Sequence, residues 1–185
     1  MTAVPQSPVL SPKTLIWDTS PILHAIKAGK LDILGDIAQN CGGVARRNVT
    51  TQAVISEIDY FQLPLEGAGW LEVVHVDDLR ELEALVTWMA LVAGAKSNHG
   101  EATVLTWSQI HGARAVVDDR DAQRIGQQNG LDVCGSLRVV AESVSDGHIT
   151  EYAGSALVDS MIDSGARYPC QRGQFLPWCK QHGLL

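Results

Sequence analysis

The sequence predicts a single α/β domain, folded as a three-layer α/β/α sandwich with a mainly parallel central sheet. The 185 residues suit one domain with a sizeable core. Short apolar segments alternate with longer segments whose apolar residues recur at helical spacing. This alternation is typical of parallel strands joined by helices that cover both faces of a sheet. We expect a flexible segment at 1–13, the domain at 14–168, and a C-terminal tail without a clear pattern at 169–185.

The first half of the chain contains three predicted strands. Residues 14–18 form a short apolar run that ends in an acid, and further strands are expected at 45–51 and 70–76. Ser20, as N-cap, and Pro21 are expected to begin a helix that Gly29 ends. Further helices are predicted at residues 31–39, 52–61 and 79–93, the last with an apolar stripe of Leu79, Leu82, Leu85, Val86, Met89 and Ala90.

The second half continues the alternation. Helices are predicted over residues 100–112 and 121–128, with a buried strand at 113–119 between them. Gly130 follows the second of these helices, as glycine often does at a helix end. The remaining elements are a short strand at 131–135, a helix over 137–144 capped by Ser136, and a final helix at about 152–164.

Composition narrows the function classes. Fourteen Lys and Arg residues stand against twenty-one Asp and Glu, so the formal net charge is -7, which disfavours nucleic-acid or membrane binding by bulk charge. The four cysteines form no CxxC pair, which predicts reduced thiols. The N-terminus has no signal-peptide pattern, and the most apolar run, at 85–95, is too short to span a bilayer. We expect a cytoplasmic protein without a membrane segment.

Three aspartates stand where predicted strands end. Asp18 follows the first strand, and Asp118 and Asp119 end the strand at 113–119. In an open parallel sheet, ligands bind beyond the carboxyl ends of the strands. Aspartate is also common where a strand turns into a loop, so each of the three could be an ordinary turn residue.

Two glutamates lie on the apolar sides of predicted helices. Glu57 shares a helix face with Val54 and Phe61, and Glu101 lies in a first helical turn with Val104 on its own face. A first-turn carboxylate is favoured by the helix dipole. Either glutamate alone could border the core without any further role.

Together, these acids could converge on one point. Such a cluster repels itself and needs a counter-charge, for which a hard divalent cation is well suited. Carboxylate oxygens favour Mg²⁺ or Mn²⁺ over zinc. The matching chemistry is phosphodiester hydrolysis, in which a metal orients the phosphate and activates a water.

The order of the motifs resembles a known family. LIWDTSPIL, AVISEI, NHGEATVL and AVVDDRDAQRIGQQNGLDVCGS follow one another as in PIN domains, the fold of VapC-type toxin ribonucleases. The later segments LRVVAESVSDGHI and SMIDSGARY are similar to a PIN subgroup described only as nucleic-acid-binding. No single motif is specific, but the four in order cover nearly the whole chain. The resemblance implies a metal-dependent ribonuclease.

The resemblance also implies roles for particular residues. Thr19 and Ser20 match hydroxyl residues that orient the acids in PIN domains, and the usual threonine of the fourth motif is missing. Asp118 is expected as a second ligand or a supporting group, and Asp121 as a helix cap. The implied catalytic residues and metal ligands are Asp18, Glu57, Glu101 and Asp119.

An RNA substrate would need local positive charge. We expect it from Lys96 and Arg120, which flank the acids in sequence, and from Arg46 and Arg47 before the second strand. The resemblance implies a small antitoxin partner and a homodimer, for which the helix at 79–93 offers apolar residues. The five tryptophans mostly fall in apolar stripes and are interpreted as core.

One alternative class of protein remains open, and a second is set aside. A non-catalytic nucleic-acid- or protein-binding module could keep the fold, although it would gain nothing from clustered carboxylates. A phosphotransfer receiver domain expects two acids after the first strand and a lysine after the last. Here the first strand offers only Asp18 and the last ends in VCG, so this class is set aside.

Overall fold

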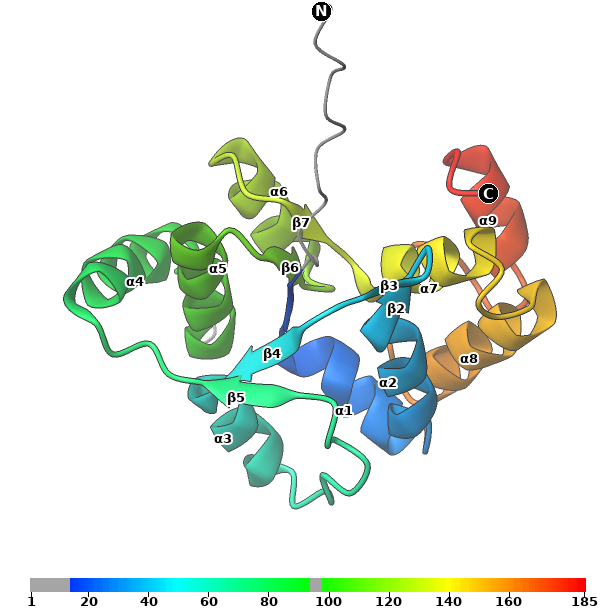
Figure 1. The fold of residues 1–185 in the computed structure, drawn as a ribbon, viewed down its shortest axis with the longest axis horizontal. Helices are drawn as coiled ribbons and strands as arrows, with labels where there is room; N and C mark the ends of the chain where they lie inside the picture. Colours follow the sequence, from blue (N-terminus) through cyan, green and yellow to red (C-terminus); the bar gives the residue numbers. More distant parts are fainter. Residues whose placement is uncertain (1–13, 94–97) are drawn as a thin grey trace, which may run out of the picture.

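The computed structural model describes residues 14–93 and 98–185 and has a parallel sheet at its centre (Figure 1). The strand order is β5-β4-β1-β6-β7. Ile16 of the fully buried central strand pairs with Val49 on one side and Ala115 on the other. The strands are β1 (Leu15–Trp17), β4 (Asn48–Thr51), β5 (Glu72–Val74), β6 (Arg114–Val116) and β7 (Val133–Cys134).

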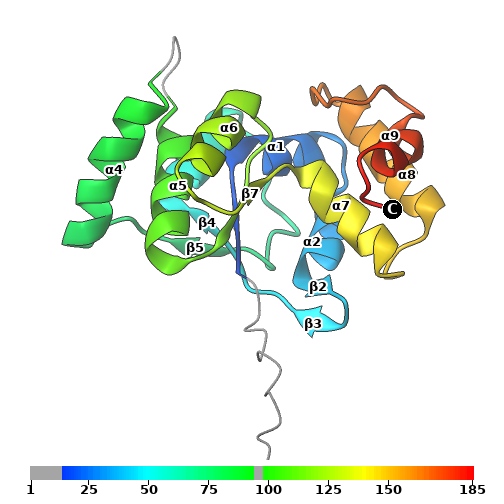
Figure 2. The same ribbon diagram turned by 90° about the horizontal axis from the view of Figure 1, so that it is seen from above.

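Helices cover both faces of this sheet, which confirms the predicted α/β/α sandwich. Helix α5 packs against β1, β4 and β6, and α4 packs on α5. Figure 2 shows α4, α5 and α6 on one side of β1, with α1, α2, α7 and α8 on the other. No helix in the described ranges is long and apolar enough to cross a membrane. The helices are α1 (Thr19–Lys27), α2 (Leu31–Gln39), α3 (Gln52–Tyr60), α4 (Leu79–Leu91), α5 (His99–His111), α6 (Arg120–Gln128), α7 (Ser136–Ser145), α8 (Glu151–Asp163) and α9 (Phe175–Gln181).

Two elements have no counterpart among the predicted ones. A small antiparallel hairpin joins β2 (Asn40–Cys41) to β3 (Val44–Ala45). Its turn consists of Gly42 and Gly43 with φ of +55° and +76°, a conformation that two-residue hairpin turns require and glycine adopts without strain. The second element is α9, which buries Phe175 and Cys179 and packs on α8, so much of the segment 169–185 is ordered structure.

Three predicted helix caps are wrong. Helix α1 begins at Thr19, directly after Asp18, so Ser20 lies inside the first turn. Helix α7 begins at Ser136, and its N-cap position is Gly135. The N-cap of α6 is Asp119, not Asp121. In each case the chain turns into the helix one or two residues earlier than the sequence suggests.

Most of the apolar stripe predicted for α4 does not face the core, although Leu85 packs against it. Leu79 and Val86 are 73% and 71% exposed, whereas Glu81 and Trp88 are buried. Glu81 accepts hydrogen bonds from the backbone of Asp77 and Asp78, which completes a capping box. Because α4 is the outer helix on α5, only its narrow inner face is covered. The outer apolar face is therefore left exposed on the described chain.

Candidate active site

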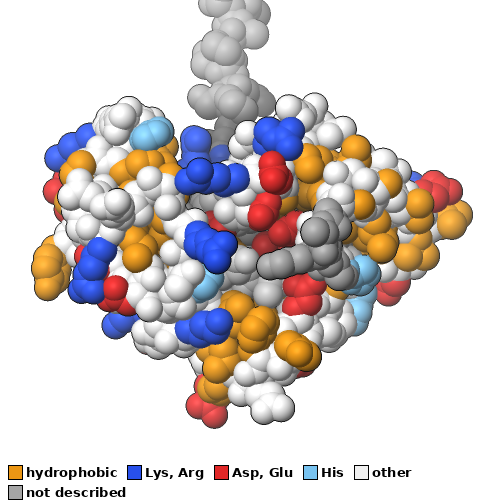
Figure 3. Space-filling view, turned by 180° about the vertical axis from the view of Figure 1, so that it is seen from behind, with side chains coloured by type: hydrophobic (Ala, Val, Ile, Leu, Met, Phe, Trp, Pro, Cys, Tyr) orange, Lys and Arg blue, Asp and Glu red, His pale blue; other side chains and the backbone are white. Residues whose placement is uncertain are grey.

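The acids predicted to form a site meet at the carboxyl edge of the sheet. Asp18 follows β1, and Asp118 and Asp119 follow the neighbouring parallel strand β6. The backbone N–H of Asp18 donates to the carbonyl of Val116 at 3.0 Å, which fixes the two strand ends beside each other. Figure 3 shows acidic side chains gathered near the middle of one face, with Lys and Arg side chains beside them.

Glu57 is held in place by two neighbouring elements. Its Oε1 accepts a hydrogen bond from the backbone N–H of Gly100 at 2.8 Å, and its Oε2 accepts one from Thr19 Oγ1. A Cβ atom at Gly100 would lie 2.6–2.8 Å from the Glu57 carboxylate, closer than side chains tolerate. The glycine of the GEA triplet thus makes room for Glu57. Sequence reasoning did not assign this role, although the adjacent Glu101 drew attention to the triplet.

Asp18 and Glu101 each bury one oxygen atom that has no hydrogen-bond partner in the described residues, Asp18 Oδ1 and Glu101 Oε2. Burial raises the pKa of Asp18 to about 7, with further elevation by the charges of Glu57 and Asp118. Burial likewise raises the pKa of Glu101 to about 8, and the charges of Asp18, Asp119 and Glu57 add to this. The four acids predicted as ligands therefore form one electrostatic cluster.

The two aspartates after β6 have different surroundings. Asp119 Oδ1 accepts hydrogen bonds from the backbone of Asp121 and Ala122, both at 2.9 Å, and so caps α6. Asp118 binds Ser136 through both oxygens, at 2.7 Å from its backbone nitrogen and 2.8 Å from its hydroxyl. Burial raises the pKa of Asp118, and these hydrogen bonds oppose the rise. Asp118 is thus tied to α7 in this arrangement, which favours the supporting role.

An open cavity of about 470 Å³ lies over this cluster. Asp18, Glu57 and Glu101 line it, together with both predicted hydroxyl residues. Sequence reasoning missed part of its wall, which consists of Leu23, Tyr60 and Phe61. Phe61 was assigned to the apolar face of its helix but is 46% exposed, and the exposed Tyr60 leaves no periodic signal.

The donor set suits a hard cation, although the acids are not gathered into a complete ligand cage. No group of three or more His, Cys, Asp or Glu side chains within the described ranges is arranged to hold a metal ion. Mg²⁺ is often bound by only one or two carboxylates, with water and substrate phosphate completing its shell. The unpartnered oxygens of Asp18 and Glu101 meet that requirement, because each is buried, anionic when ionised and free to coordinate.

The basic residues predicted to bind RNA lie in different places. Arg120 begins α6, directly after Asp119, whereas Lys96 lies outside the described residues. Arg46 and Arg47 precede β4, at the opposite edge of the sheet from the acids. Their partners, at 2.9 Å or less, are Glu142 for Arg46 and Glu72 for Arg47. RNA binding by Arg46 and Arg47 stays untested, and their positions favour a structural role.

A parallel α/β sheet with four coupled carboxylates at its carboxyl edge is the arrangement of a nuclease-type fold. Comparison with known families agrees: a family model described as a PIN domain (DUF3368) matches residues 14–174. The chain belongs to the PIN domain family, which confirms the resemblance found in its motifs. PIN domains are generally nucleases and typically use divalent metals. A search of curated proteins found no match to the chain.

Proposed function

We propose that this protein is a metal-dependent ribonuclease that hydrolyses RNA phosphodiester bonds. The observation that carries the proposal is the pair of buried, unpartnered carboxylate oxygens, Asp18 Oδ1 and Glu101 Oε2, in a cavity lined by a third acid. Buried polar atoms without partners are rare in native proteins, and each calls for an explanation. A bound cation would pair these oxygens and offset the repulsion within the cluster.

Each acid has a distinct part in this proposal. Mg²⁺ or Mn²⁺ would supply charge neutralisation and an activated water for attack on phosphorus. Asp18 and Glu101 would hold the ion directly, and Glu57, fixed by Thr19 and Gly100, would orient water or metal beside them. Asp119 keeps one carboxylate oxygen beyond its cap bonds and so remains a candidate ligand.

The rim of the cavity supports a single-stranded substrate. Tyr60 and Phe61 are 84% and 46% exposed and meet edge to face, with ring centroids 5.8 Å apart. The Lys27 ammonium lies 5.0 Å from the centre of the Phe61 ring. Exposed aromatic rings beside a cation are a common means of holding unstacked bases and their phosphates.

One observation favours the alternative, a non-catalytic binding module on the same fold. Glu57 and Asp119 are already engaged by hydrogen bonds, and no three-ligand metal group is formed in the described ranges. Such a module would bind nucleic acid or protein without metal. Metal dependence of cleavage therefore separates the two functions.

The proposal extends to partners. The exposed apolar face of α4 supports a homodimer, and the resemblance of the sequence motifs to VapC-type toxins supports a small antitoxin that blocks the acidic cavity. The buried free thiols of Cys134, Cys170 and Cys179 fit a reducing cytoplasm. If the protein is a toxin, expression of the native chain should arrest host growth, and expression of the Asp18→Asn variant should not.

The test of the enzymatic claim is cleavage of single-stranded RNA by purified protein with Mn²⁺ or Mg²⁺. We expect cleavage that chelator abolishes and added metal restores, and that is lost in Glu101→Gln. Glu83→Gln, which changes an exposed glutamate on α4, should cleave like the native chain. Cleavage that persists in chelator, or in Glu101→Gln purified identically, would show a contaminating or metal-independent activity and overturn the proposal.

A further inference from the structure

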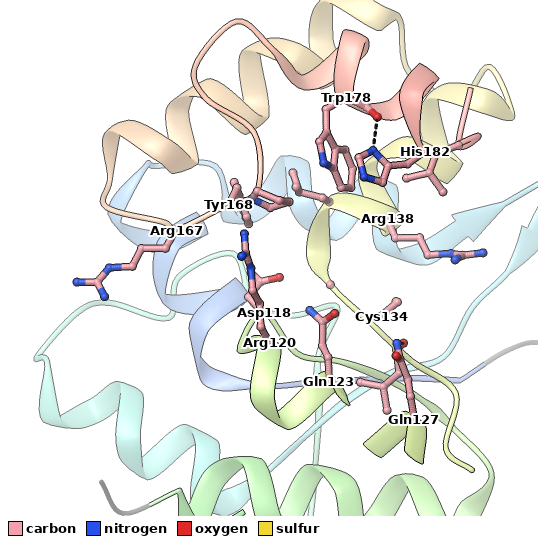
Figure 4. Close-up of a pocket in the computed structure, with 15 residues that line it drawn as sticks. Asp118, Arg120, Gln123, Gln127, Cys134, Arg138, Arg167, Tyr168, Trp178 and His182 are labelled. Carbon is pink, nitrogen blue, oxygen red and sulfur yellow. Dashed lines mark hydrogen bonds between the residues drawn. The ribbon is translucent and has the colours of Figure 1, made fainter. Parts of the chain in front are cut away.

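A second cavity of about 340 Å³ has Asp118 in its wall (Figure 4). Residues from α6, the start of α7, the segment after α8, and α9 form its walls. This places the C-terminal helix, which the sequence did not reveal, beside the catalytic edge of the sheet. Its lining includes Arg120, Arg138, Arg167, Gln123, Gln127 and Trp178.

Three arginines belong to the lining of this cavity, and Figure 4 shows the Arg138 and Arg167 side chains extending outward from its rim. Arg120 and Arg167 form no ion pair within the residues that the structure describes. Arg138 pairs only with Glu142, at 3.3 Å, and that carboxylate is shared with Arg46 and Arg114. Guanidinium groups left without carboxylate partners around a cavity are suited to an anionic ligand, phosphate above all.

The cavity also offers groups that suit a nucleobase. The rings of Trp178 and His182 lie 4.6 Å apart at 30°, and a hydrogen bond of 2.8 Å from His182 Nδ1 to the Trp178 carbonyl holds the pair together. The side-chain amide nitrogens of Gln123 and Gln127 donate to Val117 and Val133 carbonyls. Their amide oxygens therefore remain as acceptors, which base edges can contact by donating hydrogen bonds.

Residues that line this cavity are adjacent in sequence to an acid of the cluster. Asp118 forms part of its wall, the next residue is the proposed ligand Asp119, and Arg120 then lines the cavity again. A strand whose phosphate lies at the acids would thus meet Arg120 at the next position. The net charge of -7 does not prevent this, because phosphate contacts are local.

We propose that this cavity holds one nucleotide of the RNA strand, adjacent to the bond that is cut. Arg120 and Arg167 contact its phosphate, and its base lies against the Trp178–His182 pair. The inference rests on the proposed function in taking RNA as the ligand. It adds a binding site separate from the acids and gives the C-terminal helix a role in substrate binding.

Binding can be tested without cleavage, by fluorescence anisotropy of a short single-stranded RNA with Glu101→Gln protein in chelator. Adding Arg120→Gln and Arg167→Gln should weaken binding by roughly tenfold and reduce the slope of log affinity against log salt by about 1.4. Trp178→Leu should weaken it by roughly tenfold through lost stacking. Arg172→Gln, an exposed arginine paired with Asp163, is the control and should bind like the parent. Thermal unfolding checks that each variant folds, and Trp178→Phe replaces Trp178→Leu if it does not.

Several outcomes separate this inference from the proposed function. In the active enzyme, the double arginine variant should raise KM and leave kcat nearly unchanged. Metal-dependent cleavage with an unchanged KM and salt slope would overturn the inference and leave the function standing. RNA binding that is weakened by the cavity variants, in a protein that does not cleave RNA, would overturn the proposed function and leave the inference standing. A nucleoside monophosphate that binds as tightly as the oligonucleotide, or an acidic peptide that binds while RNA does not, would overturn the strand assignment.

Discussion

At the scale of single residues, the site depends on how closely Gly100 approaches Glu57. The glycine donates its backbone N–H to one carboxylate oxygen and leaves no room for a methyl group beside it. Thr19 binds the other oxygen, so Glu57 has little freedom to rotate. The motif could be recognised from the sequence, but the contact could not, because 43 residues separate its partners.

Gly100→Ala should displace the Glu57 carboxylate and lower kcat/KM by at least tenfold, since small misplacements of catalytic groups have large effects. The substitution should not unfold the protein, because alanine is the better helix former. In a Glu57→Gln background it should have little further effect, which a double-variant cycle measures. A full additional loss in that background would show that Gly100 acts independently of Glu57.

The pKa values of Asp18 and Glu101 predict how stability depends on pH without metal. Burial raises both, to about 7 and about 8, from 3.8 and 4.5, so the folded protein retains protons that the unfolded chain releases. Their stabilising effect is complete below about pH 4 and is lost as the pH rises to about 8. We expect Tm in chelator to fall over this range, and Mn²⁺ to restore it most at the alkaline end.

Asp18→Asn should flatten this decline and raise Tm in chelator at pH 8, because the uncharged amide removes the buried charge. Asp59→Asn, on the exposed side of α3, is the matched control and should behave like the native chain. Differential scanning calorimetry across the pH range measures both. A Tm that rises steadily towards pH 8 in chelator would contradict the buried-charge account.

At the scale of elements, Asp119 both caps α6 and faces the acidic cluster. Asp119→Asn should keep the cap and leave stability nearly unchanged but abolish cleavage, whereas Asp119→Ala should also destabilise the fold by about 1 kcal/mol. The corresponding variants of Asp78, the N-cap of α4, provide the control: Asp78→Ala should lower stability without affecting cleavage. Full activity in Asp119→Asn would exclude this residue from the site.

Helices and strands were predictable where the periodicity of apolar residues and the order of neighbouring elements indicated the same structure. The buried strand β1 and the helix α5 follow their apolar patterns, and their order specifies the parallel sheet. The hairpin β2–β3 has strands of two residues, which are too short to show an alternation of apolar and polar residues. Helix α9 has only seven residues, and Pro177 lies within it. Periodicity revealed the apolar face of α4 but not what covers it. Caps failed because tertiary contacts, such as Ser136 with Asp118, decide where a helix starts.

At the scale of the whole molecule, two surfaces outside the acidic cluster have features of binding sites. The first is the arginine-lined cavity beside Asp118. Although the net charge is -7, positive side chains are thus gathered next to the acidic cluster. The outer face of α4 exposes several apolar side chains, and a contiguous apolar patch often marks an interaction site. These are Leu79, Leu82, Val86, Met89 and Leu91.

We expect this α4 face to form the homodimer interface. The native chain should sediment as a dimer, and Val86→Glu should sediment as a folded monomer whose Tm falls only by the loss of the partner, because Val86 is 71% exposed and contributes little to the core. Tyr152→Glu, at an even more exposed position on α8, is the control and should remain dimeric. A monomeric native chain, or a dimeric Val86→Glu variant, would contradict the assignment.

The central claim is that the acidic cluster binds a divalent cation, and calorimetric titration of Mn²⁺ into the protein without RNA tests it most directly. We predict saturable binding to the native chain that is lost in both Asp18→Asn and Glu101→Gln, whose buried oxygens lack partners, and kept in Asp59→Asn. Equal binding to all four proteins, or no binding to the native chain, would contradict the claim.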